Sequence, residues 1–109
     1  MAGTDVHAAA GSDFDTAVNM SPAVLKKWLA TDESQAVGQK VDGAGESTGH
    51  ESGRHIVEML GKNRDKWTDT DWEHAQRVVS YVKRHLAQRP RDVAGSRWEA
   101  SLKNWGHQP

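Results

Sequence analysis

The segment between Thr68 and Pro90 limits the possible folds of this chain more than any other part of the sequence. Thr68 is a typical residue before a helix, because its side-chain oxygen can accept from a backbone amide of the first turn. Pro90 cannot continue a helix. Between them the apolar residues share one arc, less than half the circumference wide: Trp72, Ala75, Val78, Val79, Val82 and Leu86. The segment predicts an amphipathic helix that other elements must cover.

Four further segments carry helix signals of the same kind. They begin at Ser12, Ser21, near Thr48, and at Ser96. Pro22 occupies the first helical position of the second segment, while Gly61 and Gly106 provide C-terminal stops for the last two. No segment alternates apolar and polar residues as a strand does. The sequence therefore predicts an all-α fold: a single small domain, residues 12–109, of four or five short helices.

Two segments carry no helical pattern. Residues 1–11 are small and polar and are predicted to form a disordered N-terminal tail. Residues 32–47 hold three glycines and no apolar stripe, so they predict a long flexible loop between the second and third helices. The lack of aromatic residues there favours a tolerated insertion over a functional loop.

Composition excludes several classes of protein. The chain has 109 residues and no cysteine, which rules out disulfides and thiolate metal sites. No apolar run is long enough to cross a membrane, and the N-terminus lacks the features of a signal peptide. We therefore expect a cytoplasmic protein with no membrane partner.

The chemistry-bearing residues do not form a recognisable catalytic or metal motif. The six histidines include no H-E-x-x-H pair, and His50 and His55 lie off a common helical face. The sequence has no glycine-rich phosphate loop between a strand and a helix, and no nucleophile elbow. We predict no cofactor, no metal and no enzymatic activity.

Basic residues gather before, on and after the fourth predicted helix. The candidate nucleic-acid-binding residues are Lys62, Arg64, Lys66, Arg77, Arg84, Arg89 and Arg91. With Tyr81 among them, they could hold phosphates and stack a base. The alternative is a solvated helix face, in which Glu73 pairs with Arg77 and the late cations favour the helix dipole. The net charge of −1 gives no general attraction to nucleic acid.

The five tryptophans are predicted to lie chiefly in the core. Trp28, Trp72, Trp98 and Trp105 fall on apolar stripes, and Trp67 is placed to pack on Trp72 across the start of the fourth helix. An aromatic binding surface is the alternative. His85 borders the apolar arc and is expected to be a packed histidine, whereas His107 could cap the last helix or contact a partner.

Three segments resemble one family of small bacterial and fungal proteins: "VNMSPAVLKKWLATDES", "GRHIVEMLGKNRDKWTDTDWEHAQRVVSYVKRHLAQRP" and "RWEASLKNWGHQP". The family is the domain of unknown function 3140 family, some members of which carry the label DNA-binding protein. The resemblance implies a fold unit and a weak nucleic-acid function. The sequence thus predicts a non-enzymatic protein that binds DNA or another nucleic acid weakly through the basic surface. The alternative is a protein–protein interaction or structural module.

Overall fold

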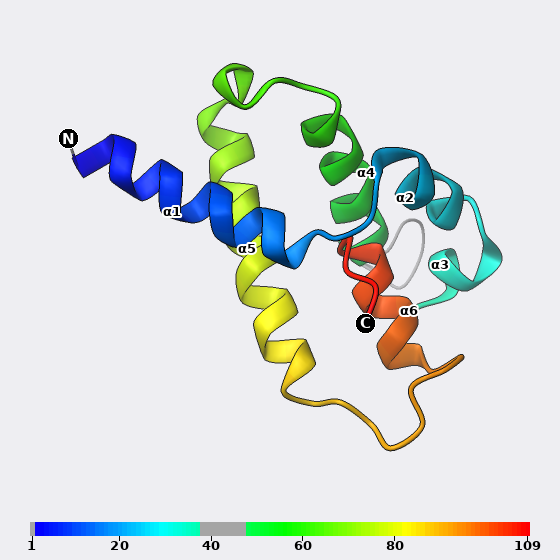
Figure 1. Ribbon diagram of the computed structural model, residues 1–109. Helices are drawn as coiled ribbons and strands as arrows, with labels where there is room; N and C mark the ends of the chain where they lie inside the picture. The colour runs from blue at the N-terminus through cyan, green and yellow to red at the C-terminus, as the bar shows by residue number, and fades with distance from the viewer. Residues whose placement is uncertain (1, 38–47) are drawn as a thin grey trace.

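The computed structural model describes residues 2–37 and 48–109, and within these ranges every regular element is helical (Figure 1). The elements are α1 (Ala2–Ala17), α2 (Pro22–Leu29), α3 (Asp32–Ala36), α4 (Thr48–Leu60), the 3-10 helix η2 (Arg64–Lys66), α5 (Asp69–Leu86) and α6 (Arg97–Asn104). The all-α prediction is confirmed.

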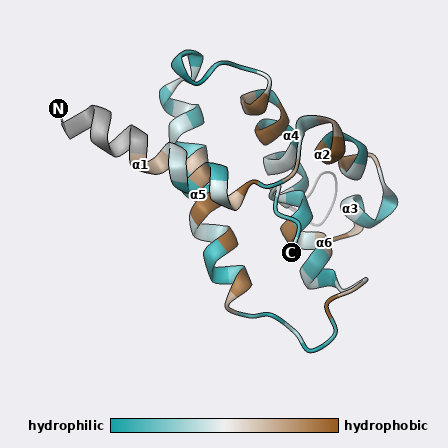
Figure 2. Cartoon of the chain, in the orientation of Figure 1, coloured by the Kyte–Doolittle hydropathy of each residue, from teal (hydrophilic) through white to brown (hydrophobic). Residues whose placement is uncertain are grey.

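Two packed groups make up the molecule. The first group is α1 packed along α5 (Figure 1). The second group contains α2, α3, α4 and α6, with α6 in contact with the other three helices and also with α5. Apolar and hydrophilic residues alternate along α2, α4 and α5, as amphipathic helices require (Figure 2). The fully buried core takes side chains from five helices: Phe14, Leu25, Ile56, Met59, Val78 and Leu102.

Helix caps follow the sequence signals closely. The side chains of Ser21, Thr68 and Ser96 each accept a hydrogen bond from a backbone amide of the helix that follows. Gly106 ends the α6 segment with a φ of 82°, a conformation that favours glycine. The predicted boundaries of these three helices are therefore confirmed.

The N-terminal prediction is wrong for the described residues 2–11, which belong to α1. The helix begins before Ser12, so Ser12 is not its cap; the Ser12 carbonyl instead accepts a hydrogen bond from the Thr16 hydroxyl. Gly11 is buried, and a Cβ there would collide with the Arg64 side chain. Gly11 therefore leaves room for the Arg64 side chain against α1.

The loop prediction for residues 32–47 is wrong for its first part. Thr31 caps α3, Ser34 is buried, and Val37 belongs to the core. Apolar periodicity could not reveal α3, because this short helix is held chiefly by polar contacts. The rest of the predicted loop, residues 38–47, lies outside the described residues.

Asn104 ties α3 and α2 to α6. Its side-chain oxygen accepts from the Trp28 indole (2.8 Å) and from the Ser34 hydroxyl, and its amide donates to the Ser34 carbonyl (3.0 Å). Asn104 is only 1% exposed, so these bonds satisfy polar groups that water cannot reach.

Gly53 explains how α4 and α6 come together. A Cβ on Gly53 would lie 2.6 Å from the Asn104 carbonyl oxygen and 2.6 Å from a Leu29 methyl carbon. Glycine costs helix propensity, so its presence inside α4 fits this close approach of another helix backbone.

The tryptophans are mainly core residues, as predicted. Trp67, Trp98 and Trp105 are buried, and Trp28 and Trp72 are partly buried against the core. Trp67 and Trp72 meet edge to face with ring centres 4.9 Å apart. Two residues of the predicted apolar stripes are instead exposed: Val24 by 50% and Leu86 by 37%.

Candidate functional site

A continuous stack of six aromatic rings joins α4, α5 and α6. In order along the stack, the rings belong to His55, His74, Trp105, Tyr81, His85 and Trp98. Neighbouring ring centres are 4.1–6.1 Å apart, and neighbouring planes are within 25° of parallel. From His74 onward, three rings come from α5 and two come from the α6 segment, where Trp105 is the C-cap residue. Trp105 lies between His74 and Tyr81, so the two segments interlock.

Asp71 anchors the His55 end of this stack. Its side chain, 5% exposed, accepts hydrogen bonds from Lys62 (2.7 Å), His55 (2.8 Å) and the Thr68 amide (3.0 Å). Burial by itself would raise the pKa of Asp71, but the three hydrogen bonds and the Lys62 charge outweigh burial and hold this pKa well below its usual range. Asp71 lies in the first turn of α5, where a carboxylate favours the helix dipole, and it also ties α4 and the segment before α5 to this helix.

Two histidines of the stack, His74 and His85, have lowered pKa values. Burial, together with the charges of His55 and Arg77, lowers the pKa of His74 to about 4. Burial also lowers the pKa of His85. The His85 ring lies against the Trp98 carbonyl, and the Trp98 indole donates to the His85 carbonyl at 2.6 Å. The prediction of a packed histidine at position 85 is confirmed.

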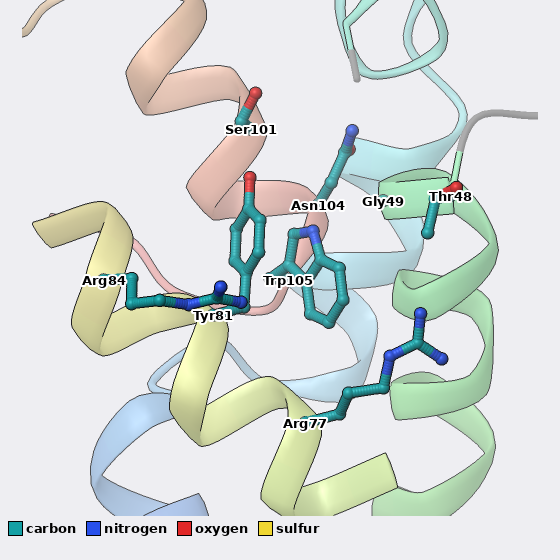
Figure 3. Close-up of a pocket in the computed structure, with 8 residues that line it drawn as sticks. All are labelled: Thr48, Gly49, Arg77, Tyr81, Arg84, Ser101, Asn104 and Trp105. Carbon is teal, nitrogen blue, oxygen red and sulfur yellow. The ribbon is translucent and has the colours of Figure 1, made fainter. Parts of the chain in front are cut away.

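A cavity of about 360 Å³ opens beside the middle of the stack, between α4, α5 and α6 (Figure 3). Its lining includes Thr48, Arg77, Tyr81, Arg84, Ser101 and Trp105. An adjoining cavity of about 280 Å³ shares Thr48, Arg77 and Trp105 and adds Glu51, Ser52 and His74. We call the larger one the α5 cavity.

Hydrogen-bond donors outnumber acceptors in the α5 cavity. Arg77 and Arg84 extend from α5 on either side of the ring pair formed by Tyr81 and Trp105 (Figure 3). Among the described residues, no carboxylate lines this cavity. The predicted ion pair between Glu73 and Arg77 does not form, and no described residue forms an ion pair with Arg77. The arrangement suits an anionic ligand.

The seven predicted nucleic-acid-binding residues lie in separate places. Lys62 and Arg64 lie near the start of α5, Arg77 and Arg84 line the α5 cavity, and Arg89 lies beyond the end of α5. Lys66 and Arg91 are exposed outside the cavity. Because α5 has 18 residues, its ends are about 27 Å apart at about 1.5 Å per residue. The predicted residues therefore do not form one compact patch.

Three of these cations have partners inside the molecule. Lys62 pairs with Asp71, and the Arg64 guanidinium bonds Asp15 at 2.8 Å and lies 4.3 Å from the centre of the Trp67 ring. Arg89 lies 5.8 Å from the centre of the Trp98 ring. The expected stacking of a base on Tyr81 also fails, because Trp105 and His85 cover the two faces of the Tyr81 ring.

Sequence reasoning missed the contributions of Thr48, Ser101 and Trp105 to the α5 cavity. A signal was present in the spacing: His74 and Tyr81 are seven residues apart on α5, as are Trp98 and Trp105 on α6. Two aromatic stripes with the same two-turn spacing can interlock along a pair of helices. Neither stripe alone identifies its partner.

Two further histidines, His50 and His107, make structural contacts. His50 donates to the Leu29 carbonyl at 2.7 Å, and the His107 ring bonds the Ala17 carbonyl at 2.7 Å. His107 thus holds the end of α1 and does not cap α6. In the described part of the chain, no three histidine or carboxylate side chains gather as a metal site.

Comparison with known proteins defines the class and then the family. The fold is a small helical domain. Among the described helices, none is both long enough and apolar enough to cross a membrane. Residues 13–103 match the family model described as protein of unknown function DUF3140, so the chain belongs to that family. No curated protein and no solved structure matches the chain significantly.

Proposed function

We propose that this protein is a non-enzymatic binding module that holds nucleic-acid phosphates at the α5 cavity. The observation that carries the proposal is the convergence of Arg77 and Arg84 on one cavity. In the part of the chain that the structure describes, neither arginine pairs with a carboxylate and no acidic residue lines this cavity. Arginine is well suited to phosphate, because its planar guanidinium donates two parallel hydrogen bonds.

The cavity recognises phosphate and leaves the sequence of bases unread. Both faces of Tyr81 are covered by other rings, and Trp105 lies between His74 and Tyr81. Binding through phosphates alone is sequence-independent and depends strongly on salt. We therefore expect weak binding with little preference among sequences.

Fluorescence anisotropy with a labelled oligonucleotide at two salt concentrations tests the proposal. The wild-type protein should bind at low salt and lose affinity steeply as salt rises. The double variant Arg77→Gln, Arg84→Gln should bind more weakly, with a salt dependence flatter by roughly one unit of slope per lost contact.

A matched control removes two exposed cations elsewhere. Lys26 and Lys27 lie on α2 and line neither the α5 cavity nor its neighbour. The variant Lys26→Gln, Lys27→Gln has the same net charge as the arginine variant and should bind like wild type. If wild type does not bind single-stranded or duplex DNA at low salt, the proposal fails and a protein-interaction module takes its place.

A further inference from the structure

We infer that the α5 cavity takes a phosphate monoester, the group at the end of a nucleic-acid strand or on a free nucleotide, in preference to an internal phosphodiester. The inference rests on the proposed function and specifies its ligand. Its basis is the set of hydrogen-bond donors that line the cavity. A diester has fewer free oxygens and a smaller charge than a monoester, so it would leave some of these donors without an acceptor.

The first observation is an indole donor that faces the cavity. Trp105 is 5% exposed and lines the cavity, yet no described residue accepts a hydrogen bond from its indole Nε1–H. The other two tryptophans of the buried set donate to carbonyls, Trp67 to Met59 and Trp98 to His85. No fully buried side-chain nitrogen or oxygen in the described residues lacks a partner, so the Trp105 N–H opens onto the cavity, where it can donate to a ligand acceptor.

The second observation is the close approach of Gly49 to that donor. Gly49 lies in the first turn of α4, and a Cβ on Gly49 would stand 3.1 Å from the Trp105 Nε1 atom. With glycine there, the indole N–H and the start of α4 border the same cavity (Figure 3). The 13-residue helix α4 also contributes the positive end of its dipole at this point.

The third observation concerns charge. Arg77 and Arg84 bring two positive charges to the α5 cavity, and the acidic residue Glu51 lines the adjoining cavity instead. A phosphate monoester carries a charge of about −1.5 to −2 at pH 7 and three acceptor oxygens. An internal diester carries one charge and two free oxygens. The monoester therefore matches two guanidinium groups, the indole N–H and the Thr48 hydroxyl better.

The test compares two single-stranded oligonucleotides of one sequence, one with a 5′-phosphate and one with a 5′-hydroxyl. We expect the phosphorylated strand to bind at least about tenfold more tightly, which corresponds to about 1.4 kcal/mol. Deoxyadenosine monophosphate should compete and deoxyadenosine should not. Competition at similar affinity would identify the free nucleotide as a sufficient ligand; weaker competition would identify the strand end.

Trp105→Phe removes the indole donor and keeps the ring and the net charge. It should reduce the preference for the phosphorylated strand several-fold, whereas Trp98→Phe, which loses an indole that is already satisfied, should keep the preference. Melting temperatures show whether both variants fold. If Trp105→Phe does not fold, the shift of the Trp105 indole N–H resonance on adding deoxyadenosine monophosphate to wild type decides the matter.

The possible failures are distinct. Equal binding of the two strands, with no shift of the indole resonance, overturns the monoester inference and leaves the proposed function intact. Absence of binding by either strand and by the mononucleotide overturns both.

Discussion

The cations before α5 and the cations in the middle of α5 look alike in sequence but have different partners. Lys62 and Arg64 pair with Asp71 and Asp15, and Arg64 also covers the Trp67 ring. Arg77 and Arg84 have no such carboxylate partners among the described residues and line a cavity. The comparison teaches that internal pairing, which a sequence does not display, separates cations that hold a fold from cations available to a ligand.

The largest expected effect concerns the anchor of the first region. Asp71→Ala removes three hydrogen bonds to a buried carboxylate, and bonds to charged groups contribute about 1.5–3 kcal/mol each before water replaces them. We expect the free energy of unfolding to fall by about 3 kcal/mol in a urea titration. Asp69→Ala, an exposed change in the same turn, is the control. Equal stability of the two variants would contradict the structural role of this region.

A second prediction follows from the lowered pKa of His74. The pKa of His74 is about 4 in the folded protein against an ordinary 6.5, so the unfolded chain binds a proton first as pH falls. The free energy of unfolding should therefore drop between pH 6.5 and pH 4, by about 2 kcal/mol after allowance for partial exposure. His85, whose pKa is lowered, adds in the same direction.

Asp71 extends this loss to lower pH. Its pKa is depressed in the folded protein, so its contribution is present above pH 4 and disappears as pH falls further. His74→Phe keeps a ring and removes the titration, so its stability should vary less between pH 6.5 and pH 4. A stability of wild type that is constant over that range would show that His74 is not held neutral.

A smaller effect separates two neighbours in the 62–66 segment. Arg64→Gln removes an exposed ion pair and a cation–π contact, each of which contributes on the order of 0.5–1 kcal/mol. Lys66→Gln changes an exposed cation for which no ion pair is seen among the described residues. We expect Arg64→Gln to lower the melting temperature by several degrees and Lys66→Gln to leave it unchanged. The reverse order would contradict the assigned contacts.

The helices with strong local signals could be predicted from the sequence. Ser21, Thr68 and Ser96 cap their helices through contacts three residues away, so the local sequence contains all the information needed. The arc of α5 also predicted its buried side, although Leu86 at its end is exposed. These elements depend on patterns within a single segment.

The parts that could not be predicted depend on contacts between distant residues. Helix α3 is held by Ser34 against Asn104, seventy residues away along the chain. The α5 cavity needs Thr48, Arg77 and Trp105 to meet from three helices. The pattern within one segment does not predict contacts between different helices. For this reason the predicted basic surface included residues that lie apart in the structure.

The measurement that tests the central claim most directly compares two double variants with the same net charge. One carries Lys62→Gln and Arg64→Gln, and the other carries Arg77→Gln and Arg84→Gln. The melting temperature and the oligonucleotide affinity are measured for both. The account predicts that the first variant melts at a lower temperature and, where folded, binds like wild type. The second should melt within a few degrees of wild type, since exposed changes cost within about 0.5 kcal/mol each, and bind more weakly. Loss of binding in the first variant with retention in the second would contradict the account.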